Sequence, residues 1–121
     1  MDFKLSQISI IMLGTKDIAG SIEFYRSKLG LEVRNQIPGF AFLNAGPVTL
    51  CLSEALAKAA GDPVAGATEV VFSVEHVRAA HEALTANGVT FTNEPRNVTG
   101  PFWAANFNDP DGHKLSVFGN E

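Results

Sequence analysis

The feature that most constrains the fold of this chain is an internal repeat, because one order of elements occurs twice. Residues 7–13 are rich in β-branched side chains and predict a strand. Asp17 then suits a helix N-cap, and apolar residues at 18, 22, 25 and 29 form one face of a helix that Gly30 ends. Further strands are predicted at 31–33, 40–44 and 48–53.

The second half of the chain repeats this order. A strand at 69–74 is followed by His76 in the place of Asp17, a helical stripe of Val77, Ala80 and Leu84, and Gly88 at the helix end. Further strands are predicted at 89–91, 103–107 and 114–118, the last two joined by the turn Asp109-Pro110-Asp111-Gly112. The repeat predicts a βαβββ unit used twice.

We therefore predict one α+β domain over residues 1–121. Its first module covers about 5–54 and its second about 68–119, with a linker at about 55–67 that starts as a short helix. A chain of 121 residues is long enough to bury a core without disulfides.

The charge and composition of the chain argue against some classes of partner and indicate its cellular compartment. The formal net charge of −4 argues against nucleic acid and anionic membranes as partners. No segment approaches the ~20 apolar residues that span a bilayer, and the N-terminus lacks the apolar core of a signal peptide. The single cysteine, Cys51, cannot close an internal disulfide, so we expect a cytoplasmic protein.

Residues 17–31 (Asp-Ile-Ala-Gly-Ser-Ile-Glu-Phe-Tyr-Arg-Ser-Lys-Leu-Gly-Leu) resemble the first helix of the vicinal oxygen chelate superfamily. The second half is similar to the same family through Phe72-Ser73-Val74, Asn87-Gly88-Val89 and Asp109-Pro110-Asp111-Gly112. That superfamily includes glyoxalase I, bleomycin-resistance proteins, fosfomycin-resistance enzymes and extradiol dioxygenases. The resemblance implies two βαβββ modules, each an open curved sheet, arranged around a cup.

The resemblance also implies four metal ligands, usually His, Gln or Glu, from the first and last strand of each module. The matching positions carry Ile10, Cys51, Glu69 and Ser116. Isoleucine has no donor atom, a protonated serine hydroxyl is a poor ligand, and a cysteine thiolate mismatches hard divalent ions. We therefore expect no metal and no cofactor.

A cup without a metal still offers a ligand pocket. The candidate ligand-binding residues on the cup-facing strands are Ile10, Met12, Cys51, Glu69, Ser73, Ser116 and Phe118. Phe102 and Trp103 end a polar loop at 95–103; bleomycin-resistance proteins have a similar segment whose aromatic residue stacks on flat drug groups. The same two residues are also suited to packing at a rim or a dimer interface.

Glu69 is the one candidate for a catalytic residue. A buried and unpaired carboxylate would act as a general base or bind a cationic ligand group. The alternative is a solvated carboxylate, or one in a salt bridge, at the edge of a strand.

The sequence thus predicts a metal-independent homodimer of the glyoxalase/bleomycin resistance type that sequesters a planar or hydrophobic drug or toxic metabolite, as in antibiotic resistance. Two alternatives stay open. One is a glyoxalase-like lyase or isomerase, or a dioxygenase-related enzyme, that has a noncanonical metal or uses Glu69 as a base. The other is a scaffold for a protein partner. Whether the cup forms within one chain or across a dimer is also open.

Overall fold

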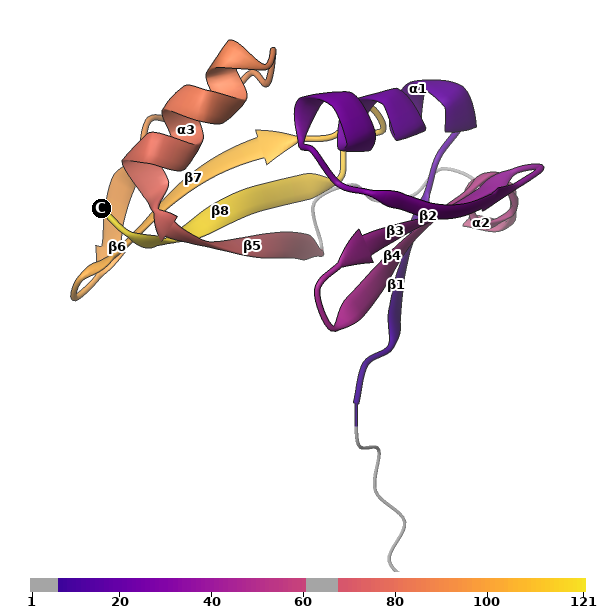
Figure 1. Cartoon of the computed structure of the whole chain (residues 1–121), viewed down its shortest axis with the longest axis horizontal. Helices are drawn as coiled ribbons and strands as arrows, with labels where there is room; N and C mark the ends of the chain where they lie inside the picture. The colour runs from indigo at the N-terminus through magenta and orange to yellow at the C-terminus, as the bar shows by residue number, and fades with distance from the viewer. Residues whose placement is uncertain (1–6, 61–67) are drawn as a thin grey trace, which may run out of the picture.

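The computed structural model describes residues 7–60 and 68–121, which form two four-stranded sheets, each with a helix on one face (Figure 1). The first sheet has the strand order β1-β4-β3-β2. We call this part module one; its elements are β1 (Ile10–Gly14), α1 (Ile18–Glu23), the π-helix η1 (Phe24–Lys28), β2 (Val33–Ile37), β3 (Phe40–Ala45) and β4 (Val48–Ser53). The π-helix replaces the second half of the expected α-helix.

Module two repeats this topology with the strand order β5-β8-β7-β6. Its elements are β5 (Glu69–His76), α3 (Val77–Ala86), β6 (Arg96–Thr99), β7 (Phe102–Asn108) and β8 (Lys114–Asn120). In both modules the first strand runs parallel to the last, and the other neighbours are antiparallel. The predicted α+β fold of two βαβββ modules is confirmed.

The segment between the modules begins with helix α2 (Glu54–Ala60), as the sequence predicts, and α2 packs against β1. The rest of the predicted linker falls on residues 61–67, outside the described residues. Among the helices of the described ranges, none is both long and apolar enough to cross a bilayer.

Two predicted strands differ from the structure. The strand predicted at 31–33 overlaps β2 only at Val33, and the one predicted at 89–91 is wrong. Residues 89–91 form no strand; only Phe91 makes an isolated bridge, to Phe107. The strand is instead β6, which falls in the expected loop at 95–103. Gly100 has a positive φ of 55°, and the turn there brings Thr99 opposite Phe102, so that β6 can pair with β7.

The core lies between each sheet and its helix, because alternate strand residues point to that side. In module one, Leu13, Leu43, Leu50 and Leu52 are buried with Tyr25. In module two, the corresponding buried set is Val77, Ala105, Phe107, Leu115 and Val117. All these residues belong to one apolar cluster that continues from one module into the other.

The Asp109-Pro110-Asp111-Gly112 turn joins the two modules. Tyr25 donates a hydrogen bond from its hydroxyl to Asp109 Oδ2 at 2.8 Å, and both groups are buried. Asp109 Oδ1 accepts the backbone N–H groups of Asp111 (2.9 Å) and His113 (2.8 Å). His113 in turn donates from Nε2 to the carbonyl oxygen of Gly14 at 2.7 Å. The turn is therefore a structural contact as well as a hairpin corner.

Candidate functional site

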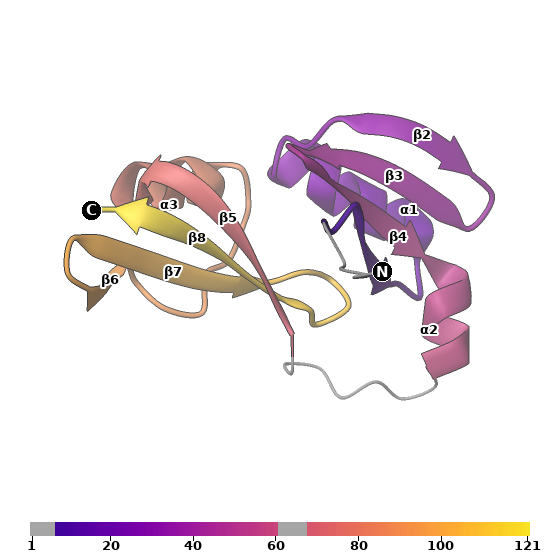
Figure 2. The same cartoon turned by 90° about the horizontal axis from the view of Figure 1, so that it is seen from below.

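Each sheet has one face that its helix leaves uncovered, and Figure 2 looks onto these faces, with α1 and α3 lying behind the strands. We call them the open faces. The strand register shows which residues share them. In module one, Met12, Cys51 and Phe42 form one row across β1, β4 and β3. In module two, Val71, Ser116 and Asn106 form the equivalent row across β5, β8 and β7.

Large apolar side chains are exposed on both open faces. On β1, Ile10 is 49% exposed and Met12 is 44% exposed; in module two, Val71 is 51% and Phe102 is 40% exposed. Ser73 is also exposed and lies opposite Phe118, whose ring stacks on that of Phe102 with 5.3 Å between centroids. Apolar side chains gathered on one side of a protein are typical of a ligand or partner site.

Cys51 and Ser116 lie in the floors of these faces. Their exposed fractions are only 0% and 2%, so a ligand would meet their neighbours Met12 and Phe42, or Val71 and Asn106, first. Burial raises the pKa of the Cys51 thiol. Because the thiolate is the nucleophile and the metal ligand, a raised pKa makes Cys51 unreactive.

The structure separates the two aromatic candidates. Trp103 lies on the helix-covered side of β7, against the core, with the Arg78 guanidinium 4.7 Å from its ring centroid. Strand alternation places its neighbour Phe102 on the open face. This placement corrects the expectation that Trp103 contacts a ligand in the cup; Phe102 and Phe118 are the aromatic pair on that face.

Glu69 is exposed, and it accepts a hydrogen bond at Oε2 from Asn106 Nδ2 at 2.9 Å. The condition of a buried and unpaired carboxylate is therefore not met. Asn106 Oδ1 accepts from Asn93 Nδ2 (3.0 Å) and Arg96 Nη2 (3.3 Å). Asn106, Asn93 and Arg96 are not among the site residues predicted from the sequence. The alternation of side chains along the strand predicted at 103–107 could have placed Asn106 on the same face as Ser116. Placing Arg96 and Asn93 near Asn106 required knowing where β6 lies.

The four positions that correspond to the family's metal ligands do not fit a divalent ion. Ile10 and Cys51 lie in module one, and Glu69 and Ser116 lie in module two, where only Glu69 offers an ordinary ligand oxygen for such an ion. Across residues 7–60 and 68–121, no group of three or more His, Cys, Asp or Glu side chains is arranged to hold a metal.

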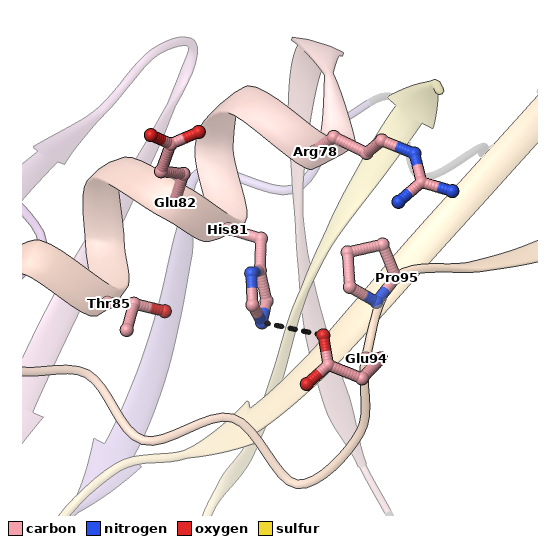
Figure 3. Close-up of a pocket in the computed structure, with 6 residues that line it drawn as sticks. All are labelled: Arg78, His81, Glu82, Thr85, Glu94 and Pro95. Carbon is pink, nitrogen blue, oxygen red and sulfur yellow. Dashed lines mark ion pairs between the residues drawn. The ribbon is translucent and has the colours of Figure 1, made fainter.

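Two cavities that residues within 7–60 and 68–121 form lie elsewhere. One, of about 400 Å³, lies between α3 and the segment before β6 (Figure 3) and is lined by Arg78, His81, Glu82, Thr85, Glu94 and Pro95. Within this cavity, His81 Nε2 is 3.9 Å from Glu94 Oε2. Arg78, which also lines it, forms an ion pair with Glu121 outside the lining, with 2.8 Å between Nε and Oε2.

The other cavity, of about 250 Å³, has a wholly apolar lining formed by Leu29, Leu31, Phe72, Val74, Ala80, Ala83, Leu84, Phe107 and Val117. None of the predicted ligand-binding residues lines either cavity, so the open faces are the candidate site.

Residues 7–117 match the protein family described as the Glyoxalase/Bleomycin resistance protein/Dioxygenase superfamily. Among solved structures, a glyoxalase/bleomycin resistance protein/dioxygenase from Nocardioides is 25% identical, with a TM-score of 0.83 over 98% of this chain and 86% of that one. UcmS2 is 28% identical, with a TM-score of 0.75 over 95% of this chain and 98% of that one.

A lactoylglutathione lyase from Agrobacterium tumefaciens is 20% identical, with a TM-score of 0.78 over 95% of this chain and 94% of that one, a likeness of fold alone. A search of the curated proteins found no match.

Proposed function

The chain belongs to the glyoxalase/bleomycin resistance protein/dioxygenase superfamily, and we propose that it is a metal-independent member that binds a planar or hydrophobic small molecule. One observation carries the proposal. The open faces combine exposed apolar side chains and the stacked Phe102–Phe118 pair with the Glu69 carboxylate.

Binding rests on burial and stacking. An aromatic ligand that covers Phe102 and Phe118 removes apolar surface from water and gains from the ring contact itself. The Glu69–Asn106 pair supplies the few polar contacts that orient a ligand in a mostly apolar pocket. The function is sequestration of a drug or a toxic metabolite. We place it in the cytoplasm because the one cysteine of the chain, Cys51, is free and buried, and proteins without disulfides are usual in that reducing compartment.

The partner we propose is a second copy of the chain. Ligand pockets bury most of the surface of a small molecule, which one open sheet face cannot do. The two sheets of one chain share no strand pairing among the described residues. We therefore propose that module one of one copy faces module two of its partner, so that each of two cups lies between the apolar face of module one and the face of module two that carries the Phe102–Phe118 pair and Glu69.

β1 and β5 are the strands suited to this contact. Each pairs with only one neighbour within the described chain, so each leaves backbone donors and acceptors on its other edge. Ile8, Ile10 and Met12 are exposed along β1 and before it, and Val71 is exposed on β5.

Isothermal titration calorimetry against a panel of planar aromatic compounds tests the binding. We expect Phe102→Ala to weaken the binding of a compound found in this way by about tenfold, because the ring contact and its burial are lost. Leu56→Ala is the control, since Leu56 is an exposed apolar residue of α2 and is not part of the sheet of module two, which carries Phe102. A panel without any binder would contradict the proposal. So would a stoichiometric divalent metal whose removal abolishes binding.

A further inference from the structure

The polar side chains of the open face of module two are connected through Asn106. We propose that Asn106 is a positioning residue that holds the Glu69 carboxylate over this face, so that the site selects ligands that present a cationic or N–H donor group. This inference rests on the proposed function, and it names the ligand chemistry that the site prefers. The contacts of Asn106, the place of Glu69 on its strand and the charges around it carry the inference.

The orientation of the Asn106 amide follows from its hydrogen bonds. Its Oδ1 accepts two donors, from Asn93 and Arg96, so its Nδ2 must be the atom that faces Glu69. Its backbone is held as well. The Asn106 N–H donates to Asn93 Oδ1 at 3.1 Å, and its carbonyl oxygen accepts from Thr92 N at 2.7 Å and Thr92 Oγ1 at 3.0 Å. The amide therefore presents a fixed donor to Glu69.

The hydrogen bond from Asn106 determines where the Glu69 carboxylate lies. Glu69 is the first residue of the edge strand β5, where an unconstrained carboxylate would extend into solvent. Its register partner on β8 is Lys114, and Asn106 lies one strand further, on β7. To reach Asn106 Nδ2, the Glu69 side chain must cross β8. The hydrogen bond thus keeps the carboxylate over the open face.

The Glu69 carboxylate keeps one oxygen for a ligand. Glu69 makes no ion pair within the described part of the chain, and there its Oε1 accepts no hydrogen bond. The cations of this face are Lys114, on the neighbouring strand, and Arg96, which is directed to Asn106. An aromatic cation that stacks on the Phe102–Phe118 pair would gain a charge-assisted hydrogen bond to Oε1, which a neutral analogue would lack.

Three probes of the same shape and different charge test the inference: 2-naphthamidine, 2-naphthamide and 2-naphthoate, each titrated calorimetrically into the full chain. We expect the amidine to bind about tenfold or more tightly than the amide. Glu69→Gln and Asn106→Leu should remove this preference, while the affinity for the amide stays within about twofold. Asn108→Leu is the matched control and should keep the preference. Asn108 lies on the same face of β7, two residues away, and makes no side-chain hydrogen bond among the described residues.

The ratio of the amidine and amide affinities separates positioning from a structural role, since a distorted site would weaken both probes alike. Asn93→Ala keeps the Asn106 side chain but removes one of its two Oδ1 donors and the acceptor of its backbone N–H, so it should lower the ratio even if Asn106→Leu does not fold. Equal binding of the amidine and the amide would overturn the inference and leave the proposed function standing. Tighter binding of the naphthoate would overturn it too, because Arg96 and Lys114 would then govern the site. Failure of all three probes, together with the aromatic panel, would overturn both proposals.

Discussion

Tyr25 forms a buried polar contact between the modules. It is fully buried, and it donates to Asp109, which is also buried and belongs to the other module. Burial raises the pKa of Tyr25 far above its usual value, and the negative charge of Asp109, the hydrogen bond to it and the charge of Asp111 raise that pKa further. The folded protein therefore holds the neutral phenol at pH values where an unfolded chain would lose the proton.

The pH dependence of stability follows from this raised pKa. An unfolded tyrosine ionises near pH 10. Below that pH the contribution of Tyr25 is fully present, and above it the free energy of unfolding falls by about 1.4 kcal/mol per pH unit, because only the unfolded state releases the proton. Chemical denaturation between pH 8 and 12 measures this slope. Tyr25 is the only tyrosine, so its absorbance also reports ionisation directly.

Tyr25→Phe is the variant that isolates this effect. At pH 8 it should cost about 1–3 kcal/mol, because Asp109 Oδ2 stays buried without its donor. Above pH 10 the gap to the native chain should narrow, since the variant has no phenol to ionise. A gap that stays constant from pH 8 to 12 would contradict this account.

At the scale of elements, helix α3 is the one that leaves space in the packing. Its residues Ala80, Ala83 and Leu84 line the apolar cavity of about 250 Å³, together with Leu29 and Leu31 of module one. Small side chains on the helix leave part of this volume empty, and empty apolar space forfeits dispersion contacts. The cavity lies between the modules, so filling it should strengthen their contact.

We expect Ala83→Leu to raise the free energy of unfolding by about 0.5–2 kcal/mol, because leucine fills apolar space and forms helix nearly as well as alanine. Ala79→Leu is the matched control; Ala79 is exposed on the same helix and does not line the cavity. Denaturant melts of the two variants give the comparison. If both variants changed the free energy of unfolding equally, filling the cavity would not be the cause of the change.

At the scale of the whole molecule, the exposed apolar residues of β1 and β5 carry the proposed association with a second copy. Met12→Glu should shift the protein toward monomers, because it places a charge where the dimer would bury an apolar side chain. Ile37→Glu is the control, since Ile37 is 48% exposed but lies on β2, at the far edge of the same sheet. Light scattering over a range of concentrations measures both. A native chain that stays monomeric throughout would contradict the proposal.

The repeated βαβββ order and the helix ends near Gly30 and Gly88 could be predicted from the sequence. So could the presence of Ile10, Cys51 and Ser116, which are poor ligands for a hard divalent ion, at positions that the family resemblance matches to metal ligands. These features are local. A period of apolar residues, a glycine at a positive φ, or a side chain that lacks a donor atom can be recognised without knowing what lies opposite.

The contacts of the site residues depend on how distant strands pair in the folded chain. The sequence placed a strand at 89–91 because those residues favour one, yet pairing with β7 formed β6 at 96–99 instead. That pairing brings Arg96 near Asn106, which in turn contacts Glu69. Trp103 lies on the side of the core for a similar reason. Strand β7 begins at Phe102, which is on the open face, and successive side chains alternate between the two faces from there. Cross-strand register depends on pairing between residues that are distant in the sequence, so it cannot be predicted from the residues of one strand alone.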